Sequence, residues 1–256
     1  MREAKKHNAT IIPVDSEHNA IFQILQGSDA PIESITLTAS GGPFREFSLE
    51  QMMRVTPEQA VKHPNWAMGA KISVDSATMI NKVLELIEAQ HLFGLPVDKL
   101  RAVIHPESII HGLVSYHDGS VLAQLSEPDM CVPLSYAMGW PNRLVSGAKP
   151  LDLAALGQLN FAEPDPNRFP AFDVALQSLK QGDSAPTVLN AANEIAVAAF
   201  LEGNISFLDI ASIIDETLQT MEMQPIPTID EALHFDSAAR AMAQKLIANI
   251  LMNKTA

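Results

Sequence analysis

A proline-rich segment divides the 256 residues of this chain into two parts with different patterns. Proline lacks a backbone N–H and interrupts both helices and strands. The segment holds Pro150, Pro164, Pro166 and Pro170. We therefore predict a linker over residues 146–170, which joins a domain of residues 1–145 to a second domain of residues 171–256.

The part before the linker alternates between strand and helix signals. Short apolar runs predict strands, and longer runs with apolar residues at helical spacing predict helices. The expected strands are 10–14, 36–38, 101–104, 109–116 and 120–125, and the expected helices begin at Ala20, Thr56 and Ala77, the last of them ending at Phe93. This order predicts an α/β or α+β fold with a mixed sheet.

The last two predicted strands flank Asp118-Gly119, a pair that is typical of tight hairpin turns. An antiparallel hairpin at the edge of a sheet often pairs with a second subunit, so we expect a homodimer through residues 109–125. After the linker, apolar residues recur at helical spacing in 187–201, 207–221 and 237–253. The second domain is therefore predicted to be all-α.

The charge balance and cysteine content argue against several classes of protein. The chain has 30 acidic and 17 basic side chains, whereas a nucleic-acid partner requires a basic surface. No apolar run is long enough for a transmembrane helix, and the first residues lack the pattern of a signal peptide. Cys131 is the single cysteine, so the expected location is the reducing cytoplasm. We expect Cys131 to be buried and without a catalytic part.

Polar residues gather on a predicted loop and helix between positions 65 and 85. In a helix, Asn81, Lys82 and Glu85 present an amide, a cation and a carboxylate on one side. Ser76 stands just ahead of the predicted helix, where hydroxyl and free backbone N–H groups bind anions such as phosphate. This arrangement predicts a phosphate site, and a capped surface helix with an ion pair is the alternative.

A second acidic cluster follows the predicted strand 10–14. Asp15 and Glu17 would stand at the carboxyl end of that strand, where α/β sheets gather ligands. Two carboxylates with a third from elsewhere suit Mg²⁺ or Mn²⁺, which prefer hard oxygen ligands. Glu85 is the candidate for the third. The alternative is an N-cap with a first-turn acid on the following helix, and the two interpretations are compatible.

Two further segments are candidates for anion binding. The strand ending at Ala39 is followed by a Ser-Gly-Gly turn at 40–42, and paired glycines let backbone N–H groups approach an oxyanion closely. Ser40 is therefore a candidate phosphate ligand, with a plain turn as the alternative. His63 stands on a loop with Trp66 and flanking prolines and glycine. That composition is typical of a lid whose histidine binds phosphate on closure.

Several motifs in a fixed order resemble one enzyme family. They are Pro13-Val14-Asp15-Ser16-Glu17-His18-Asn19, Ser40-Gly41-Gly42-Pro43-Phe44-Arg45, His63-Pro64-Asn65-Trp66, the stretch from Lys71 to Lys82, and Gly119-Ser120-Val121-Leu122-Ala123-Gln124. Together they resemble 1-deoxy-D-xylulose 5-phosphate reductoisomerase. The resemblance implies a bacterial, cytoplasmic, homodimeric enzyme of non-mevalonate isoprenoid precursor synthesis. It would isomerise and reduce its phosphosugar substrate to 2-C-methyl-D-erythritol 4-phosphate, with NADPH and Mn²⁺ or Mg²⁺.

The resemblance also implies parts for individual residues of this sequence. The cation ligands would be Asp15, Glu17 and Glu85, and residues 1–145 would form the metal- and substrate-binding catalytic domain. Catalytic parts would fall to Glu17, Lys82 and His63. The substrate, chiefly its phosphate, would be held by Ser16, Glu17, Ser40, His63, Ser76, Asn81, Lys82 and Glu85. The nicotinamide cofactor would contact Gly69, Met68 and Met130.

The chain also departs from the family pattern. The family opens with a dinucleotide-binding domain, but no strand followed by Gly-x-Gly-x-x-Gly and a helix occurs in this sequence. Residues 2–8 resemble the polar tail of a helix, which predicts a truncated enzyme without its NADPH domain. We expect such a chain not to turn over by itself. The alternatives are a non-catalytic binding or dimerisation module and a metal-dependent aldolase or isomerase that needs no NADPH.

Overall fold

The computed structural model describes residues 1–27 and 30–255, which form two compact units. Each unit is built from two separate stretches of chain. The first unit comprises Met1–Ser40 and Glu85–Pro164, and the second comprises Gly41–Leu84 and Asp165–Ala256. The domain boundaries predicted at residues 145 and 170 stay a prediction.

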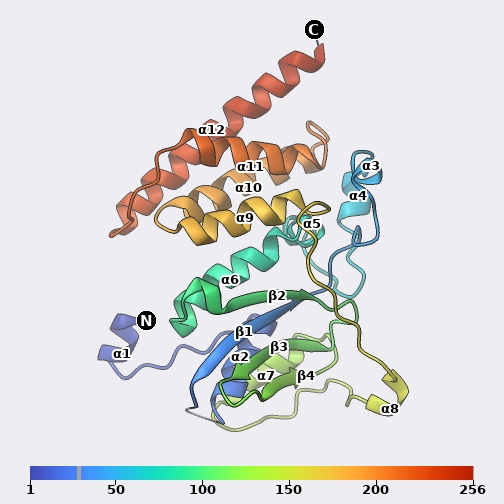
Figure 1. Ribbon diagram of the computed structural model, residues 1–256, viewed down its shortest axis with the longest axis vertical. Coiled ribbons are helices and arrows are strands. Elements are labelled where there is room, and N and C mark those ends of the chain that lie inside the picture. The colour runs from blue at the N-terminus through green and yellow to red at the C-terminus, as the bar shows by residue number, and fades with distance from the viewer. Residues whose placement is uncertain (28–29, 256) are drawn as a thin grey trace. The chain divides into compact units, whose positions relative to one another are not determined.

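A four-stranded mixed sheet runs through the first unit (Figure 1). β1 is parallel to β2 and antiparallel to β3, and β3 is antiparallel to β4. In the order β2-β1-β3-β4, the strands span Leu100–Ile104, Ile32–Ala39, Ile110–Tyr116 and Val121–Leu125. The mixed sheet and its hairpin are as the sequence predicted.

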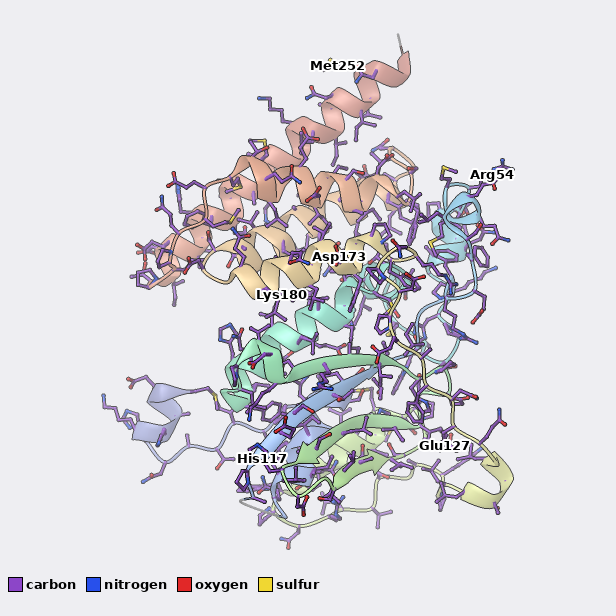
Figure 2. The ribbon with its side chains drawn as sticks, in the orientation of Figure 1. Arg54, His117, Glu127, Asp173, Lys180 and Met252 are labelled. Atoms are coloured by element: carbon purple, nitrogen blue, oxygen red, sulfur yellow. The ribbon has the colours of Figure 1, made fainter. Side chains whose placement is uncertain are left out.

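The hairpin of β3 and β4 closes at the predicted Asp-Gly turn. Gly119 has a φ of 86°, a conformation that glycine adopts without steric cost. The Asp118 carboxylate accepts hydrogen bonds from the backbone N–H and the hydroxyl of Ser120. His117, labelled in Figure 2, has its Nε2 atom 3.0 Å from Oε2 of Glu33 on the neighbouring β1. The turn is thus held by its own side chains and by an adjacent strand.

The helix α2 (Ser16–Leu25) packs against β3 and β4. Its residues Ala20 and Ile21 are fully buried. A Cβ atom at Gly112 on β3 would lie 2.8 Å from Cδ1 of Ile21 and 3.3 Å from the carbonyl oxygen of Glu17. Glycine at this position therefore lets α2 lie close to the sheet. The first turn of α2, which carries Glu17, is held in place by this packing.

The strand expected over residues 10–14 was a wrong prediction. These residues have no regular secondary structure. Pro13 has no N–H to donate to a strand ladder, and its carbonyl accepts a hydrogen bond from Nδ2 of Asn19 at 2.8 Å. An apolar run does not by itself supply a partner strand. Asp15 and Glu17 consequently stand at the beginning of a helix and not at the end of a strand.

The helix expected from Ala77 to Phe93 is in fact two helices. α5 (Ala70–Thr78) ends at Met79, which has a φ of 63°, and α6 (Ile80–Phe93) begins directly after it. The Thr78 hydroxyl donates to the carbonyl of Asp75 and accepts from the N–H of Ile80, so it competes with regular helix bonds. Ser76 therefore lies in the last turn of α5 and not ahead of a single helix.

Four helices form the bulk of the second unit, and the predicted all-α character of this C-terminal region is confirmed. They are α9 (Pro170–Gln181), α10 (Ala185–Leu201), α11 (Asp209–Thr220) and α12 (Ile229–Thr255). α10 contacts the other three. Ala192 and Ala196 on α10 are fully buried, and such small side chains permit close helix packing. Thr228 and Glu231 form a capping box, so α12 starts ahead of the expected residue 237.

The remaining elements are short. They are α1 (Arg2–Lys6), α3 (Leu49–Met52), α4 (Pro57–Ala60), the 3-10 helix η1 (Val97–Lys99), α7 (Cys131–Gly139) and α8 (Leu153–Leu156).

Cys131 is exposed, contrary to expectation, because α7 buries Pro133 and Tyr136 instead. Within the described residues, no helix has both the length and the apolarity needed to cross a membrane.

The loop that follows the Ser-Gly-Gly turn is held by contacts within the second unit. A Cβ atom at Gly42, whose φ is 68°, would lie 2.6 Å from the carbonyl oxygen of Ser76. Glycine is therefore required both by the backbone conformation and by the approach of α5. Further along, the Arg168 guanidinium donates to the carbonyls of Arg45 and Phe47, the latter at 3.3 Å.

Candidate metal and substrate site

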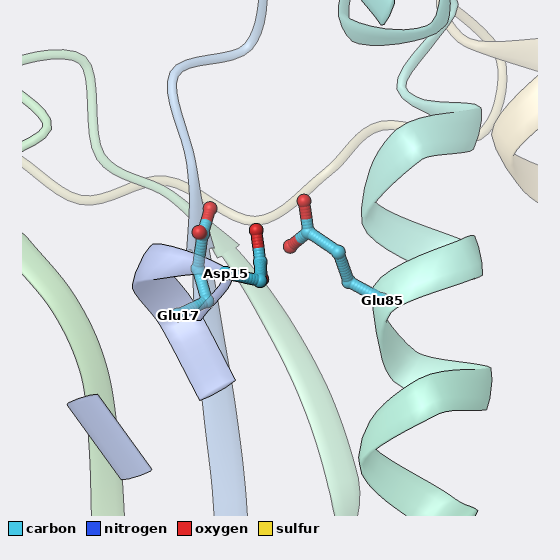
Figure 3. A group of neighbouring side chains, drawn as sticks. All are labelled: Asp15, Glu17 and Glu85. Atoms are coloured by element: carbon cyan, nitrogen blue, oxygen red, sulfur yellow. The ribbon is translucent and has the colours of Figure 1, made fainter. Parts of the chain in front are cut away.

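Three carboxylates come together in the first unit (Figure 3). Asp15 and Glu17 project from the start of α2, and Glu85 projects toward them from α6. One oxygen from each lies within 4.8 Å of the others. Carboxylates at this spacing repel one another, and a cation between them removes the repulsion. The hard oxygen donors of this set fit Mg²⁺ or Mn²⁺.

His18, which the sequence analysis did not single out, links two of these carboxylate residues. Its Nδ1 lies 2.5 Å from Oδ2 of Asp15, and its Nε2 lies 2.8 Å from the backbone carbonyl of Glu85. A carbonyl and an ionised carboxylate only accept hydrogen bonds, so both ring nitrogens carry protons. The resulting imidazolium orients Asp15 and fixes α6 at Glu85.

The surroundings of His18 favour this charged form. Burial by itself lowers the pKa of the imidazole, which is fully buried. The hydrogen bond and charge of Asp15, the charge of Glu88 and the bond to the Glu85 carbonyl outweigh burial and raise the pKa above 6.5. The signal available in the sequence was a histidine three residues after an aspartate, which places the two on one side of a helix.

Asp15 stands at the predicted N-cap position but does not cap the helix with its side chain. Asp15 is the N-cap residue of α2, yet its side chain makes no capping hydrogen bond, because it faces His18 instead. The Ser16 hydroxyl, which is buried, donates to Oε2 of Glu17 at 2.5 Å. Asp15 at the N-cap and Glu17 in the first turn thus each have a neighbouring side chain that fixes their orientation.

The other candidates of the first unit lie at the ends of its elements. Ser40 follows the last residue of β1, and Met130 directly precedes α7 and is half-buried. His105 and His111 are held as ordinary buried histidines. Nδ1 of His105 bonds the Asn160 carbonyl at 2.9 Å, and Nε2 of His111 lies 2.9 Å from the Ser126 hydroxyl.

The phosphate candidates of the second unit stand on both sides of the break at Met79. Ser76 is in the last turn of α5, whereas Asn81 and Lys82 are in the first turn of α6. Lys82 is only 4% exposed. A cation shielded from water in this way interacts strongly with an anion. Lys71, at the start of α5, is paired with Asp75 at 2.6 Å.

His63 is held in its neutral form by its position on the loop. Nδ1 accepts hydrogen bonds from the backbone N–H groups of Asn65 at 3.2 Å and Trp66 at 3.0 Å. Burial lowers the pKa of the imidazole to about 4. With Nδ1 occupied as an acceptor, the neutral ring carries its proton on Nε2, which can donate to a phosphate oxygen.

The residues proposed to contact a nicotinamide lie at accessible places. Gly69 is the N-cap of α5 with a φ of −62°, and a Cβ atom there would meet nothing within 4 Å among the described residues. Packing within the chain therefore does not require glycine at this position, and a ligand has room to approach the backbone. Met68, which precedes it, is half-buried.

Comparisons with known proteins assign this arrangement to a family. Two models match, one described as DXP reductoisomerase C-terminal domain over residues 125–242 and one as 1-deoxy-D-xylulose 5-phosphate reductoisomerase C-terminal domain over residues 11–93. This chain belongs to the 1-deoxy-D-xylulose 5-phosphate reductoisomerase family. The reductoisomerase of Pelodictyon phaeoclathratiforme is 56% identical over 245 residues, and that of Pseudomonas aeruginosa PAO1 is 53% identical over 249 residues.

The chain covers only part of these reductoisomerases. The alignments take in 95% of this chain but 64% and 63% of the two relatives. The solved reductoisomerase from Zymomonas mobilis in complex with NADPH superposes with a TM-score of 0.88 at 48% identity, covering 96% of this chain and 64% of that one. A reductoisomerase in complex with NADPH, fosmidomycin and magnesium gives 0.88 at 43% identity, covering 97% and 66%. The fold of the family is therefore present in the aligned residues.

If the carboxylate trio of Asp15, Glu17 and Glu85 holds a cation, removing one of the three carboxylates should weaken metal binding. For Glu85→Gln, we expect the Mn²⁺ dissociation constant to rise by at least the roughly 10- to 100-fold that is typical of losing a residue that hydrogen-bonds a metal ligand. Electron paramagnetic resonance titration of free Mn²⁺ measures this change. In the wild-type chain, Mn²⁺ at a hundred times its dissociation constant should stabilise the fold by about 2.7 kcal/mol.

Glu88→Gln is the matched control for that titration. Glu88 is a half-exposed acid on the same helix, 3.8 Å from His18, and it lies outside the trio. Its variant should bind Mn²⁺ nearly as the wild type does. Equal losses for Glu85→Gln and Glu88→Gln would show that general negative charge, and not the trio, attracts the ion.

The low pKa of His63 predicts a pH dependence of the loop. A folded pKa of about 4, below the ordinary 6.5, means that folding favours the neutral ring. The loop structure is then fully stabilised above pH 6.5 and loses this stabilisation as the pH falls toward 4. An NMR titration should show His63 protonating near pH 4, with the Asn65 and Trp66 amide signals moving in parallel. Protonation near pH 6.5 without those shifts would contradict the acceptor assignment.

Proposed function

We propose that this chain provides the metal- and substrate-binding part of a 1-deoxy-D-xylulose 5-phosphate reductoisomerase. The observation that carries the proposal is the convergence of Asp15, Glu17 and Glu85 in a chain whose fold matches this family. The substrate of this proposal is the sugar phosphate named by the family, and the cation is Mg²⁺ or Mn²⁺. The residues named for substrate and cofactor in the sequence analysis are part of the same proposal.

The chain's own residues bind and orient the substrate in this scheme. Lys82, Asn81 and Ser76 hold the phosphate through an ammonium, an amide and a hydroxyl, and His63 donates from Nε2 when its loop closes. Ser16 and Glu17 face the reacting carbonyl and hydroxyl groups. The charged His18 keeps Asp15 in place for cation binding. A bound cation would polarise the ketone and its adjacent hydroxyl, and NADPH would supply the hydride for reduction.

We further propose that residues 1–256 do not complete the reaction by themselves. The sequence has no Gly-x-Gly-x-x-Gly unit between a strand and a helix, so Gly69, Met68 and Met130 would give NADPH only a few contacts. The chain spans about 64% of the length of its relatives. A cytoplasmic location belongs to the same proposal and accords with the bacterial origin of these relatives and the single cysteine.

Calorimetric titrations of the chain test this proposal. We expect 1-deoxy-D-xylulose 5-phosphate to bind in the presence of Mn²⁺ and much more weakly without it, and we expect no measurable binding of NADPH. Mixing all three should give no oxidation of NADPH, followed through its absorbance. Substrate binding that ignores Mn²⁺ would contradict the metal assignment, and NADPH oxidation would contradict the inactivity of this chain.

Product analysis of the same mixtures separates the alternatives. Metal-dependent binding with unchanged substrate supports a binding part or module without chemistry. An aldehyde intermediate or its fragments, formed without NADPH, would instead show a metal-dependent isomerase or aldolase. The Glu85→Gln chain is the control, because any product that depends on the carboxylate trio should be lost with it.

We also propose that two copies of the chain pair through the hairpin. β4 lies at the edge of the sheet, and Val121 and Leu122 on it are exposed. At the opposite edge, β2 is partly covered by a bridge between Ile104 and Ala162. An edge strand with exposed apolar side chains favours pairing with a second strand.

Analytical ultracentrifugation tests this dimer. The wild-type chain should sediment as a dimer, and Val121→Lys with Leu122→Lys should shift it to the monomer, because two lysines on an edge strand oppose pairing. Leu153→Lys is a control, since Leu153 is an exposed apolar residue on α8 and is more exposed than either Val121 or Leu122. A wild-type monomer, or a dimer that survives the double lysine variant, would contradict pairing through β4.

A further inference from the structure

A buried carboxylate joins α5 to α10 within the second unit. Asp75 on α5 is 1% exposed. Its Oδ1 accepts a hydrogen bond from Nδ2 of Asn193 on α10 at 2.8 Å, and its Oδ2 lies 2.6 Å from Nζ of Lys71. Asn193 is fully buried. Neither Asp75 nor Asn193 is among the candidate metal, substrate or cofactor residues.

Burying the polar side chains of Asp75 and Asn193 between α5 and α10 costs free energy. Burial raises the pKa of Asp75, while Lys71 and Asn193 oppose that rise. Among the described residues, Oδ1 of Asn193 has no hydrogen-bond partner although it is buried, which costs free energy. Apolar side chains of similar size often stabilise a buried contact better than a charged pair does. Stability alone therefore does not account for these residue types.

A directional bond supplies what apolar packing lacks. Apolar contacts let a helix rotate or slide by small amounts, whereas a carboxylate and an amide must stay aligned to keep their hydrogen bond. α5 needs such a constraint because it has nine residues, its N-cap Gly69 provides no side-chain cap, and it ends at the left-handed Met79. The bond from Asn193 reaches Asp75, the residue directly before Ser76.

We propose that Asp75 and Asn193 are positioning residues that hold α5 in the orientation needed for phosphate binding. Through α5 and the break at Met79, they set the places of Ser76, Asn81 and Lys82. The ligand class is the phosphate monoester of a sugar, so this inference rests on the function proposed above. Their part is to orient the site, and neither residue contacts the phosphate.

The charged side chains near Asp75 and Asn193 are paired so that they do not disrupt the hydrogen bond between these two residues. Glu194, next to Asn193 on α10, would repel Asp75, but its Oε2 lies 2.7 Å from the Arg240 guanidinium on α12. Arg240 also bonds Asp236 on its own helix. Lys71 is consequently the cation that faces Asp75 directly, and its side chain is 42% exposed.

A charge-swap series in the full chain tests the inference. Asp75→Asn and Asn193→Asp each disturb the pair, whereas the double variant restores one carboxylate opposite one amide. We expect each single variant to bind 1-deoxy-D-xylulose 5-phosphate, with Mn²⁺ present, about tenfold to a hundredfold more weakly, because small displacements of binding groups have effects of this size. The double variant should recover most of the affinity.

Two further ligands show whether the loss is specific to phosphate. Affinity for Mn²⁺ alone should stay within about twofold of the wild type, a difference small beside the tenfold that corresponds to 1.4 kcal/mol. Affinity for 1-deoxy-D-xylulose, which lacks the phosphate, should change much less than that for the phosphorylated sugar. Equal losses for both sugars would overturn a part in phosphate positioning.

Two control variants separate positioning from general destabilisation. Val188→Ala removes a buried side chain of α10 that clusters with Ala191 and Ala239, and it should lower thermal stability without changing phosphate affinity. Asn190→Ala removes a polar side chain one turn from Asn193 that bonds Glu194, and it should leave affinity unchanged.

The outcomes distinguish this inference from the proposed function. If the wild-type chain shows no metal-dependent substrate binding, the proposed function fails and the inference fails with it. If the wild type binds but Asp75→Asn binds equally well, the proposed function stands and the positioning part is overturned. A loss of phosphate affinity in Val188→Ala equal to that of Asp75→Asn would also overturn it.

Discussion

Mutual repulsion among Asp15, Glu17 and Glu85 is the constraint on which the site depends. Carboxylates within 4.8 Å of one another stay together only if the surrounding fold prevents them from separating. Packing of α2 on the sheet, with Ile21 against Gly112, fixes one side of the cluster. His18 fixes the other, because its two ring nitrogens bond residues from α2 and α6. Part of the stability of the first unit therefore offsets the repulsion within this carboxylate cluster.

The second unit meets a related requirement with different groups. It presents a hydroxyl, an amide and an ammonium from α5 and α6, the two consecutive helices that meet at Met79. The anion site that we propose for these groups requires accurate orientation more than it requires resistance to repulsion, and hydrogen bonds supply orientation. The buried contact between Asp75 and Asn193 and the close approach of Gly42 to Ser76 are both constraints on where α5 lies.

The sequence predicted what depends on local pattern and failed where distant residues decide. The Asp-Gly hairpin, the mixed sheet and the helices of the C-terminal region followed from residue types at short spacing. The supposed strand at 10–14 failed because strand formation needs a partner that the segment does not meet, and its Pro13 carbonyl bonds a helix side chain instead. The break at Met79 was missed because methionine gives no turn signal. The contacts of His18 with Glu85 and of Asp75 with Asn193 join residues 67 and 118 positions apart, which periodicity does not reveal.

The contact of Arg168 with the loop after the Ser-Gly-Gly turn bears on the order in which the protein forms. The carbonyls of Arg45 and Phe47 are bonded by a side chain 123 and 121 residues later in the chain. Contacts between residues so far apart form slowly, because a long loop must close first. During synthesis, Arg168 must therefore leave the ribosome before this loop acquires its final shape. A loop that is synthesised early thus reaches its final structure only after a residue more than 120 positions later has emerged.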